Sequence, residues 1–150
     1  MTTKISTIYD ALVSVVGGVI TTYKRIPNPY FIDENNQLLL AKGFGIGVGS
    51  GTRRDLEVCK LAWNRIFTVV LVQQITTTDN NVNDRIDIEK AMLEDHFAII
   101  RAIESASTLN GNDIKADVLG DSGMQFLTGD RLKYLSISID INILYQETYS

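Results

Sequence analysis

The sequence has few of the residues on which catalytic and metal-binding sites usually depend. Among its 150 residues it has one cysteine, Cys59, and one histidine, His96. A single cysteine excludes an internal disulfide and a pair of metal-binding thiolates. His96 lies on an apolar helical stripe without a partner, which favours a packed histidine over a catalytic one. The chain also lacks the zinc-protease, nucleophile-elbow and calcium-loop patterns. We therefore expect a protein that is not an enzyme and has no metal and no cofactor.

Long apolar runs and strongly basic segments are also missing. No run of 18 apolar residues occurs, so we expect no membrane span. The net charge is −4, and adjacent basic residues occur only at Lys24 with Arg25 and at Arg53 with Arg54. This balance argues against a nucleic-acid groove as the main function. Apolar residues make up 45% and charged residues 21% of the chain, which is typical of a globular fold, and the length fits a single domain over residues 1–150.

The clearest periodicity lies in residues 133–145. Side chains in a strand alternate between two faces, and here every odd position from Leu135 to Tyr145 is apolar. The even positions are small or polar: Ser136, Ser138, Asp140 and Asn142. A slip of one residue would bury the polar set, so the register is strongly specified. We predict a strand whose apolar face is the seat for the helices.

A second strand is predicted over residues 38–51, where five glycines occupy alternate positions: Gly43, Gly45, Gly47, Gly49 and Gly51. Strand geometry would place all five on one face. Because glycine weakens a strand, such a face suggests close approach by a backbone, a helix or a partner subunit. We take Gly43, Gly45, Gly47 and Gly49 as close-packing glycines. A phosphate-binding loop is disfavoured, since the glycines do not lie between a strand and a helix and no Gly-Lys-Ser/Thr follows them.

The remaining patterns complete the fold prediction. A helix over residues 5–23 either stops near Val16 or uses Gly17 and Gly18 for close backbone contact. Residues 61–75 form a central strand covered on both sides, and residues 85–107 form a helix with a broad apolar stripe that includes Met92, Leu93 and Phe97. An irregular strand over 114–127, broken at 120–123, turns into the last strand. The order α-β-β-α-β-β predicts an α+β domain, with a mostly antiparallel sheet and both helices on one face.

Two polar segments are candidate contact loops. Residues 52–60 read as a mixed-charge link between strands, too long for a tight hairpin turn. Residues 76–84 form a polar connector that is long for a compact domain. Since loops carry binding more often than regular elements do, we take these residues as candidate subunit or partner contacts: Arg53, Arg54, Asp55, Glu57, Asp79, Asn80 and Asn81.

The whole layout resembles the tail terminator proteins of long-tailed bacteriophages. It combines an N-terminal helix, a link with Pro27 and Pro29, a glycine-rich strand at 42–51 and an aromatic, β-branched strand at 63–75. A polar loop, one long helix at 85–107 and a final hairpin ending in Ile143, Leu144 and Tyr145 follow. The resemblance covers nearly the whole chain and rests on pattern and length. It implies a small α+β subunit that forms a ring, most often a hexamer.

The resemblance also implies a role, partners and a location. Such a ring caps the tail tube, stops tube polymerisation and offers a joining surface to the head connector or neck protein. The protein would lie in the virion, in the tail or neck, after assembly in the host cytoplasm, and DNA would be only a passing cargo. The polar face Ser136, Ser138, Asp140 and Asn142 would then line the lumen or a subunit interface. Two alternatives stay open: a tail completion or neck adaptor protein, and a small ligand-binding domain or enzyme that uses the glycine-rich strand at 43–51.

Overall fold

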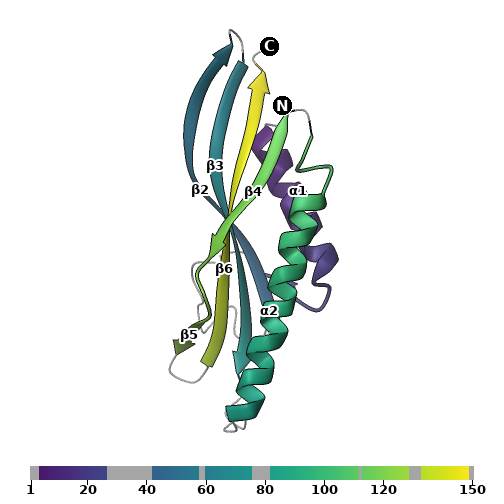
Figure 1. Ribbon diagram of the computed structural model, residues 1–150, viewed down its shortest axis with the longest axis vertical. Helices are drawn as coiled ribbons and strands as arrows, with labels where there is room; N and C mark the ends of the chain where they lie inside the picture. The colour runs from purple at the N-terminus through teal and green to yellow at the C-terminus, as the bar shows by residue number, and fades with distance from the viewer. Residues whose placement is uncertain are drawn as a thin grey trace.

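The computed structural model describes residues 4–26, 42–57, 60–75, 82–111, 113–128 and 133–148. The elements follow the order α1 (Lys4–Val19), β1 (Lys24–Arg25), β2 (Lys42–Glu57), β3 (Lys60–Ile75), α2 (Val82–Ser105), β4 (Ile114–Asp121), β5 (Gln125–Thr128) and β6 (Lys133–Thr148). The α+β class is confirmed (Figure 1). The predicted order was wrong in detail, because three strands precede α2 and three follow it. No helix in the described ranges is long and apolar enough to span a membrane.

Two features account for the difference in element order. Strand β1 is only two residues long and pairs in parallel with β2 at Gly43 and Phe44, which is too short to give a periodicity. The predicted irregular strand is two strands, β4 and β5, separated by residues 122–124. Gly123 there has a φ of 72°, a left-handed conformation that glycine adopts without steric cost. Its N–H donates to Asp121 Oδ1 at 2.7 Å, which fixes the turn.

The sheet has the order β1-β2-β3-β6-β4, and β5 pairs with β6 beyond the end of β4. All described pairings except β1 with β2 are antiparallel. Strand β6 therefore has β3 along one side and β4 followed by β5 along the other. The long strands β2, β3 and β6 run the length of the molecule with a strong twist (Figure 1). The predicted mostly antiparallel sheet is confirmed.

The main core lies between one face of this sheet and the two helices. Every odd residue of β6 from Leu135 to Tyr145 is buried there. The helices contribute Ile8, Leu12 and Val16 from α1 and Met92, Ile99 and Ile103 from α2. Both helices lie on the same side of the sheet (Figure 1). The predicted seat for the helices on β6 is therefore confirmed.

Helix α1 continues through its two glycines and ends at Val19, so the predicted stop near Val16 was wrong. A Cβ at Gly17 would lie 3.6 Å from the Phe44 ring, an ordinary contact, and a Cβ at Gly18 would meet nothing within 4 Å. The glycines therefore do not serve close backbone contact. The buried residues Ile8, Leu12 and Val16 hold the helix on the sheet despite the lower helix propensity of glycine.

A smaller apolar cluster covers part of the opposite sheet face. It consists of Ile26, Val70, Val72 and Tyr134, each about 5% exposed. Val70 and Val72 alternate with Val69 and Leu71, which belong to the main core. The prediction of a β3 covered on both faces is confirmed for this half of the strand.

A hydrogen bond joins the segment that follows α1 to the middle of α2. Tyr23 Oη donates to Asp95 Oδ2 at 2.9 Å. Burial of the phenol raises the pKa of Tyr23 well above its usual value, and the neighbouring carboxylate raises it further. The raised pKa favours the protonated phenol, which is the form that donates to Asp95.

We expect Ile139→Ala to lower the free energy of unfolding by about 3 kcal/mol, because it leaves a cavity in a fully buried position. The matched control is Asp140→Asn, one residue further on the exposed face, which should change it by less than about 0.5 kcal/mol. Guanidinium chloride unfolding measures both. Equal losses for the two variants would contradict the assignment of the two faces.

Candidate functional site

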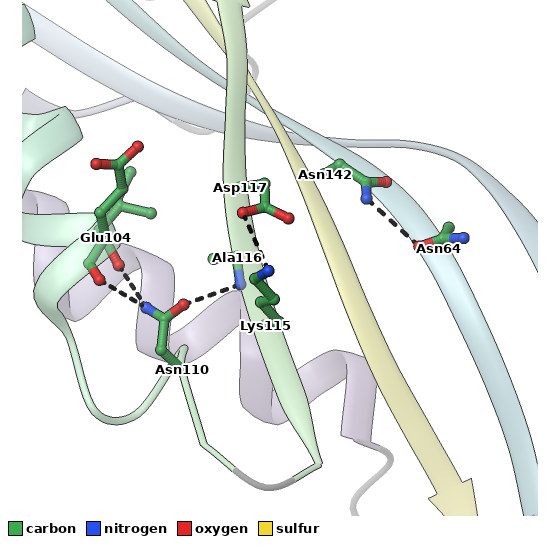
Figure 2. Close-up of polar contacts among 8 residues, drawn as sticks. Asn64, Glu104, Asn110, Lys115, Ala116, Asp117 and Asn142 are labelled. Carbon is green, nitrogen blue, oxygen red and sulfur yellow. Dashed lines mark hydrogen bonds and ion pairs between the residues drawn. The ribbon is translucent and has the colours of Figure 1, made fainter.

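The sheet face opposite the helices carries a row of polar side chains contributed by three strands. Pairing of β3 with β6 sets Thr68 opposite Asp140, and pairing of β4 with β6 sets Asp117 opposite Asn142. Thr68 Oγ1 donates to Asp140 Oδ1 at 2.8 Å, and Asn142 Nδ2 donates to Asn64 Oδ1 at 3.4 Å. We define the polar face as Asn64, Thr68, Lys115, Asp117, Asp140 and Asn142, four of which are labelled in Figure 2.

The polar face is open and weakly acidic. Asp117, Asp140 and Lys115 are exposed, and both described helices lie on the other side of the sheet. Lys115 Nζ lies 3.9 Å from Asp117 Oδ1. An exposed ion pair of this kind contributes little to stability. The polar face therefore contributes little to the stability of the fold through this ion pair, and its charged groups are available to a neighbouring molecule.

The predicted lumen residues share this side of β6, but they do not share one environment. Ser136 is 6% exposed, so its side chain is not available to a lumen or a subunit interface. It pairs with Val72, next to Tyr134 in the smaller apolar cluster, and is buried there. Ser138 and Asn142 are half-buried, and Asp140 is exposed.

The sequence reasoning missed the polar residues that other strands add to this face. Asn64 and Thr68 lie in the aromatic, β-branched segment at 61–75, for which the sequence predicts a central strand and no polar site. Asp117 and Lys115 lie in the segment read as irregular. A signal was present at residues 64–68, where Asn64 and Thr68 are four residues apart and so share one side of a strand. Their alignment with Asp140 and Asn142 depends on the strand register, which the sequence does not show.

The prediction of a single glycine face on β2 was also wrong. Gly43, Gly45 and Gly47 are buried and pair with Val72, Val70 and Thr68 on the polar-face side. A register shift falls between Val48 and Gly51, where Gly51 pairs with Arg65. Such a bulge adds a residue and reverses the alternation. Gly51 therefore lies on the helix side of the sheet.

Close packing does explain the two glycines at the bulge. A Cβ at Gly49 would lie 2.9 Å from the Ile66 backbone oxygen, and one at Gly51 would lie 2.7 Å from Arg65 Cζ. The Arg65 guanidinium donates to Tyr145 Oη at 3.2 Å and to the Gly49 oxygen at 3.1 Å, and it stacks 5.4 Å from the Trp63 ring centre. The space beside Gly51 is filled by Arg65, which argues against a ligand cradle there.

The predicted contact loop after the glycines is part of a hairpin. Pairing of β2 with β3 continues to Glu57 opposite Lys60, so the prediction of a link too long for a tight turn was wrong. Arg53, Arg54, Asp55 and Glu57 all belong to β2, because pairing resumes beyond each register shift. Arg53 is exposed. The side chains of Arg54, Asp55 and Glu57, and the candidate contacts Asp79, Asn80 and Asn81, lie outside the described residues.

A turn after α2 covers the outer edge of β4. The side-chain nitrogen of Asn110 donates to the Glu104 carbonyl oxygen at 3.3 Å, and its side-chain oxygen accepts from the Ala116 N–H at 3.1 Å (Figure 2). The same nitrogen donates to the Ile103 and Ala106 carbonyl oxygens at 2.9 and 3.1 Å. The Gly111 N–H donates to the Ile114 oxygen at 2.8 Å. Asn110 thus caps the C-terminal end of α2 and occupies the outer edge of β4.

The titratable residues of the described chain do not assemble into a catalytic centre. His96 is half-buried, and its Nε2 lies 3.2 Å from Asp121 Oδ2. Within the described ranges no three His, Cys, Asp or Glu side chains lie where they could hold a metal ion. Cys59 lies outside those ranges.

Comparisons with known proteins add no family assignment. The sequence matches no model of a known protein family, and a search of curated proteins finds no match. The features that bear on function are therefore the polar face, the sheet edges and the order of elements along the chain.

We expect Gly49→Ala to lower the free energy of unfolding by about 2 kcal/mol, because the new Cβ would meet a backbone oxygen that cannot easily move. Gly18→Ala is the matched control. It sits in α1 with open space around it and should raise the free energy of unfolding by about 0.5–1 kcal/mol. Thermal and denaturant unfolding measure both changes. A neutral Gly49→Ala would contradict the close-packing role.

Proposed function

We propose that this protein is a ring-forming structural subunit of a phage virion, a tail terminator that caps the tail tube and stops its polymerisation. The observation that carries the proposal is the one-sided sheet. Helices cover one face of the sheet. On the other face, the part that carries Asp117 and Asp140 is open and polar. A subunit with this division can present its sheet to a central channel and its helices to the outside.

The direction of the strands suits a ring. Because β2, β3, β6 and β4 are successively antiparallel, β4 runs opposite to β2. In a ring whose axis follows the strands, the β4 edge of one copy would face the β2 edge of the next, and the strands at the two edges would run in opposite directions. Contacts between two different surfaces of identical subunits close into a ring when the rotation fits. Strands of 16 residues would line a channel wall about 50 Å long.

The charge of the polar face suits the passage of DNA. Asp117 and Asp140 are exposed on it and Lys115 is its single cation, within a chain of net charge −4. Double-stranded DNA carries about one negative charge per 1.7 Å of its axis. Repeated around a ring, these carboxylates would repel the phosphates, so DNA would pass without binding to the wall.

The place in the tail rests on the resemblance of the chain layout to tail terminators. The partners would be the tail tube protein on one side of the ring and the head connector or neck protein on the other, and the protein would lie in the virion. A neck adaptor differs from a terminator in position, not in ring architecture. A ligand site on the glycine strand has less support, because Gly43, Gly45 and Gly47 are buried and Arg65 fills the space beside Gly51.

Assembly provides the direct test. We expect the purified protein to form a ring in native mass spectrometry and negative-stain images, and to shorten tubes when added to polymerising tail tube protein. Antibody labelling of virions should then mark the head-proximal end of the tail. A strict monomer over a wide concentration range, without an effect on tube length, would overturn the proposal. Antibody label found only at the head connector would favour the alternative, a neck adaptor protein.

The charge of the channel can be tested separately. Asp140→Lys should leave the ring intact and create retention of double-stranded DNA that weakens as salt rises. Asp87→Lys makes the same change of charge on the exposed side of α2, outside the channel, and should not retain DNA. Gel-shift and salt-titration measurements compare the two rings. Equal retention by both would show that Asp140 does not line the path of the DNA.

A further inference from the structure

Helix α2 carries an apolar stripe that does not enter the core. Ile86, Leu93 and Phe97 are 41%, 48% and 56% exposed, and their spacings of seven and four residues place them on one side of the helix. We define these three residues as the α2 stripe. Leu93 and Phe97 belong to the broad apolar stripe that the sequence predicted for this helix, but only part of that stripe is buried. Met92, Ile99 and Ile103 pack on the sheet, and Leu93 and Phe97 stay exposed.

The α2 stripe lies on the flank of the helix that faces the β4 edge of the sheet. Two polar contacts fix the rotation of the helix. Asp95 points to Tyr23, which lies just beyond α1, and His96 points to Asp121 at the end of β4. Phe97 follows His96 by one further step of about 100° away from Asp95. The exposed Phe97 ring therefore points outward on the β4 side.

An apolar pocket lies at the opposite edge, between α1 and β2. It has a volume of about 370 Å³ and is lined by Ile5, Ser6, Tyr9, Asp10 and Val48. Val48 is 45% exposed. Tyr9 accepts a hydrogen bond at 2.9 Å from Arg25 of β1, the strand at the β2 end of the sheet. We define this hollow as the α1–β2 pocket.

The α2 stripe and the α1–β2 pocket lie at nearly the same level along the strands. His96 contacts Asp121, and the pairing leads from Asp121 through Ile139 and Val69 to Ile46. Val48 is two residues from Ile46, which corresponds to about 7 Å. A closed ring relates its copies by rotation without translation along the axis, so surfaces that meet must lie at one level.

The charges around the two surfaces are complementary. Asp10 lines the α1–β2 pocket, and Arg101 stands one helical turn from Phe97. Arg25 bonds to Tyr9 at the pocket, and Glu94 stands one turn from Phe97 on its other side. All four charged side chains are exposed. An apolar centre with opposite charges at its rim is the usual composition of a specific interface.

From these observations we infer that the α2 stripe of one copy docks into the α1–β2 pocket of the next copy around a ring. The occupant of the pocket is thus a second copy of this chain, with Phe97 as the central anchor and Arg101 beside Asp10. This inference rests on the ring-forming part of the proposed function. It also explains how copies can associate although the Asn110 turn occupies the β4 edge at Ile114 and Ala116, where extension of the sheet is blocked.

Two complementary variants test the contact. Phe97→Asp places a charge in the α2 stripe and leaves the α1–β2 pocket unchanged. Val48→Asp places a charge in the pocket and leaves the stripe unchanged. Each alone should weaken self-association by at least about 30-fold, as expected for an interface anchor, and abolish the ring. An equimolar mixture should give a 1:1 heterodimer and nothing larger, because one intact stripe and one intact pocket remain. Analytical ultracentrifugation and native mass spectrometry distinguish these species.

Control variants distinguish loss of the fold from loss of ring assembly. Val19→Asp places the same charge on a residue of α1 that is 38% exposed and does not line the pocket, and it should still form rings. Circular dichroism should show the same secondary structure for all three variants. Asp10→Arg and Arg101→Asp should each weaken association, and the double variant should recover it.

The outcomes separate this inference from the proposed function. Rings from both Phe97→Asp and Val48→Asp would overturn the inference and leave the ring-forming function standing. Loss of assembly in Phe97→Asp alone would mean that stripes meet each other, which also overturns it. A wild-type protein that stays monomeric, whether or not the pocket takes up a small apolar molecule, would overturn the proposed function itself.

Discussion

The fold depends on the pairing of β3 with β6. This ladder runs from Lys60 opposite Thr148 to Ile75 opposite Lys133 without a register shift. It fixes the alternation of two 16-residue strands relative to each other, so one face collects the aliphatic side chains and the other the polar ones. Both helices then pack on the face that the ladder makes apolar, and the polar face is left open.

The strands on either side of this ladder are less regular, and their irregularities shape the edges. Strand β2 has a bulge between Val48 and Gly51, and β4 has one between Val118 and Gly120. The first turns Gly51 toward Arg65 and leaves Val48 exposed beside α1. The second bulge follows Ile114 and Ala116, where the Asn110 turn covers the edge of β4. Bulges and covered edges hinder uncontrolled pairing of strands from different molecules. Specific association between copies of this chain would then depend on side-chain contacts.

The proposed ring uses each layer of the subunit for a different purpose. The open face with Asp117 and Asp140 is placed toward the channel, where its charge repels DNA. The helices are outside, and the apolar surfaces that they expose lie at the two edges, where neighbouring copies meet. Because the α2 stripe and the α1–β2 pocket are different surfaces at one level, their contact is directional and can close without self-pairing of either surface.

Elements with a local periodicity could be predicted from the amino-acid sequence. The alternation from Leu135 to Tyr145 predicted the core face of β6, and the helical spacing predicted α1 and α2, because these patterns arise from bonds within one segment. Which side chains of such a pattern are buried depends on the tertiary structure. Ser136 is covered because Val72 and Tyr134 lie beside it, and Phe97 is exposed because Met92 and Ile99 already fill the seat on the sheet. Gly51 changes face at a bulge, and Asn110 reaches an edge six residues away. Each of these depends on which strands pair and in what register, and a linear pattern does not contain that information.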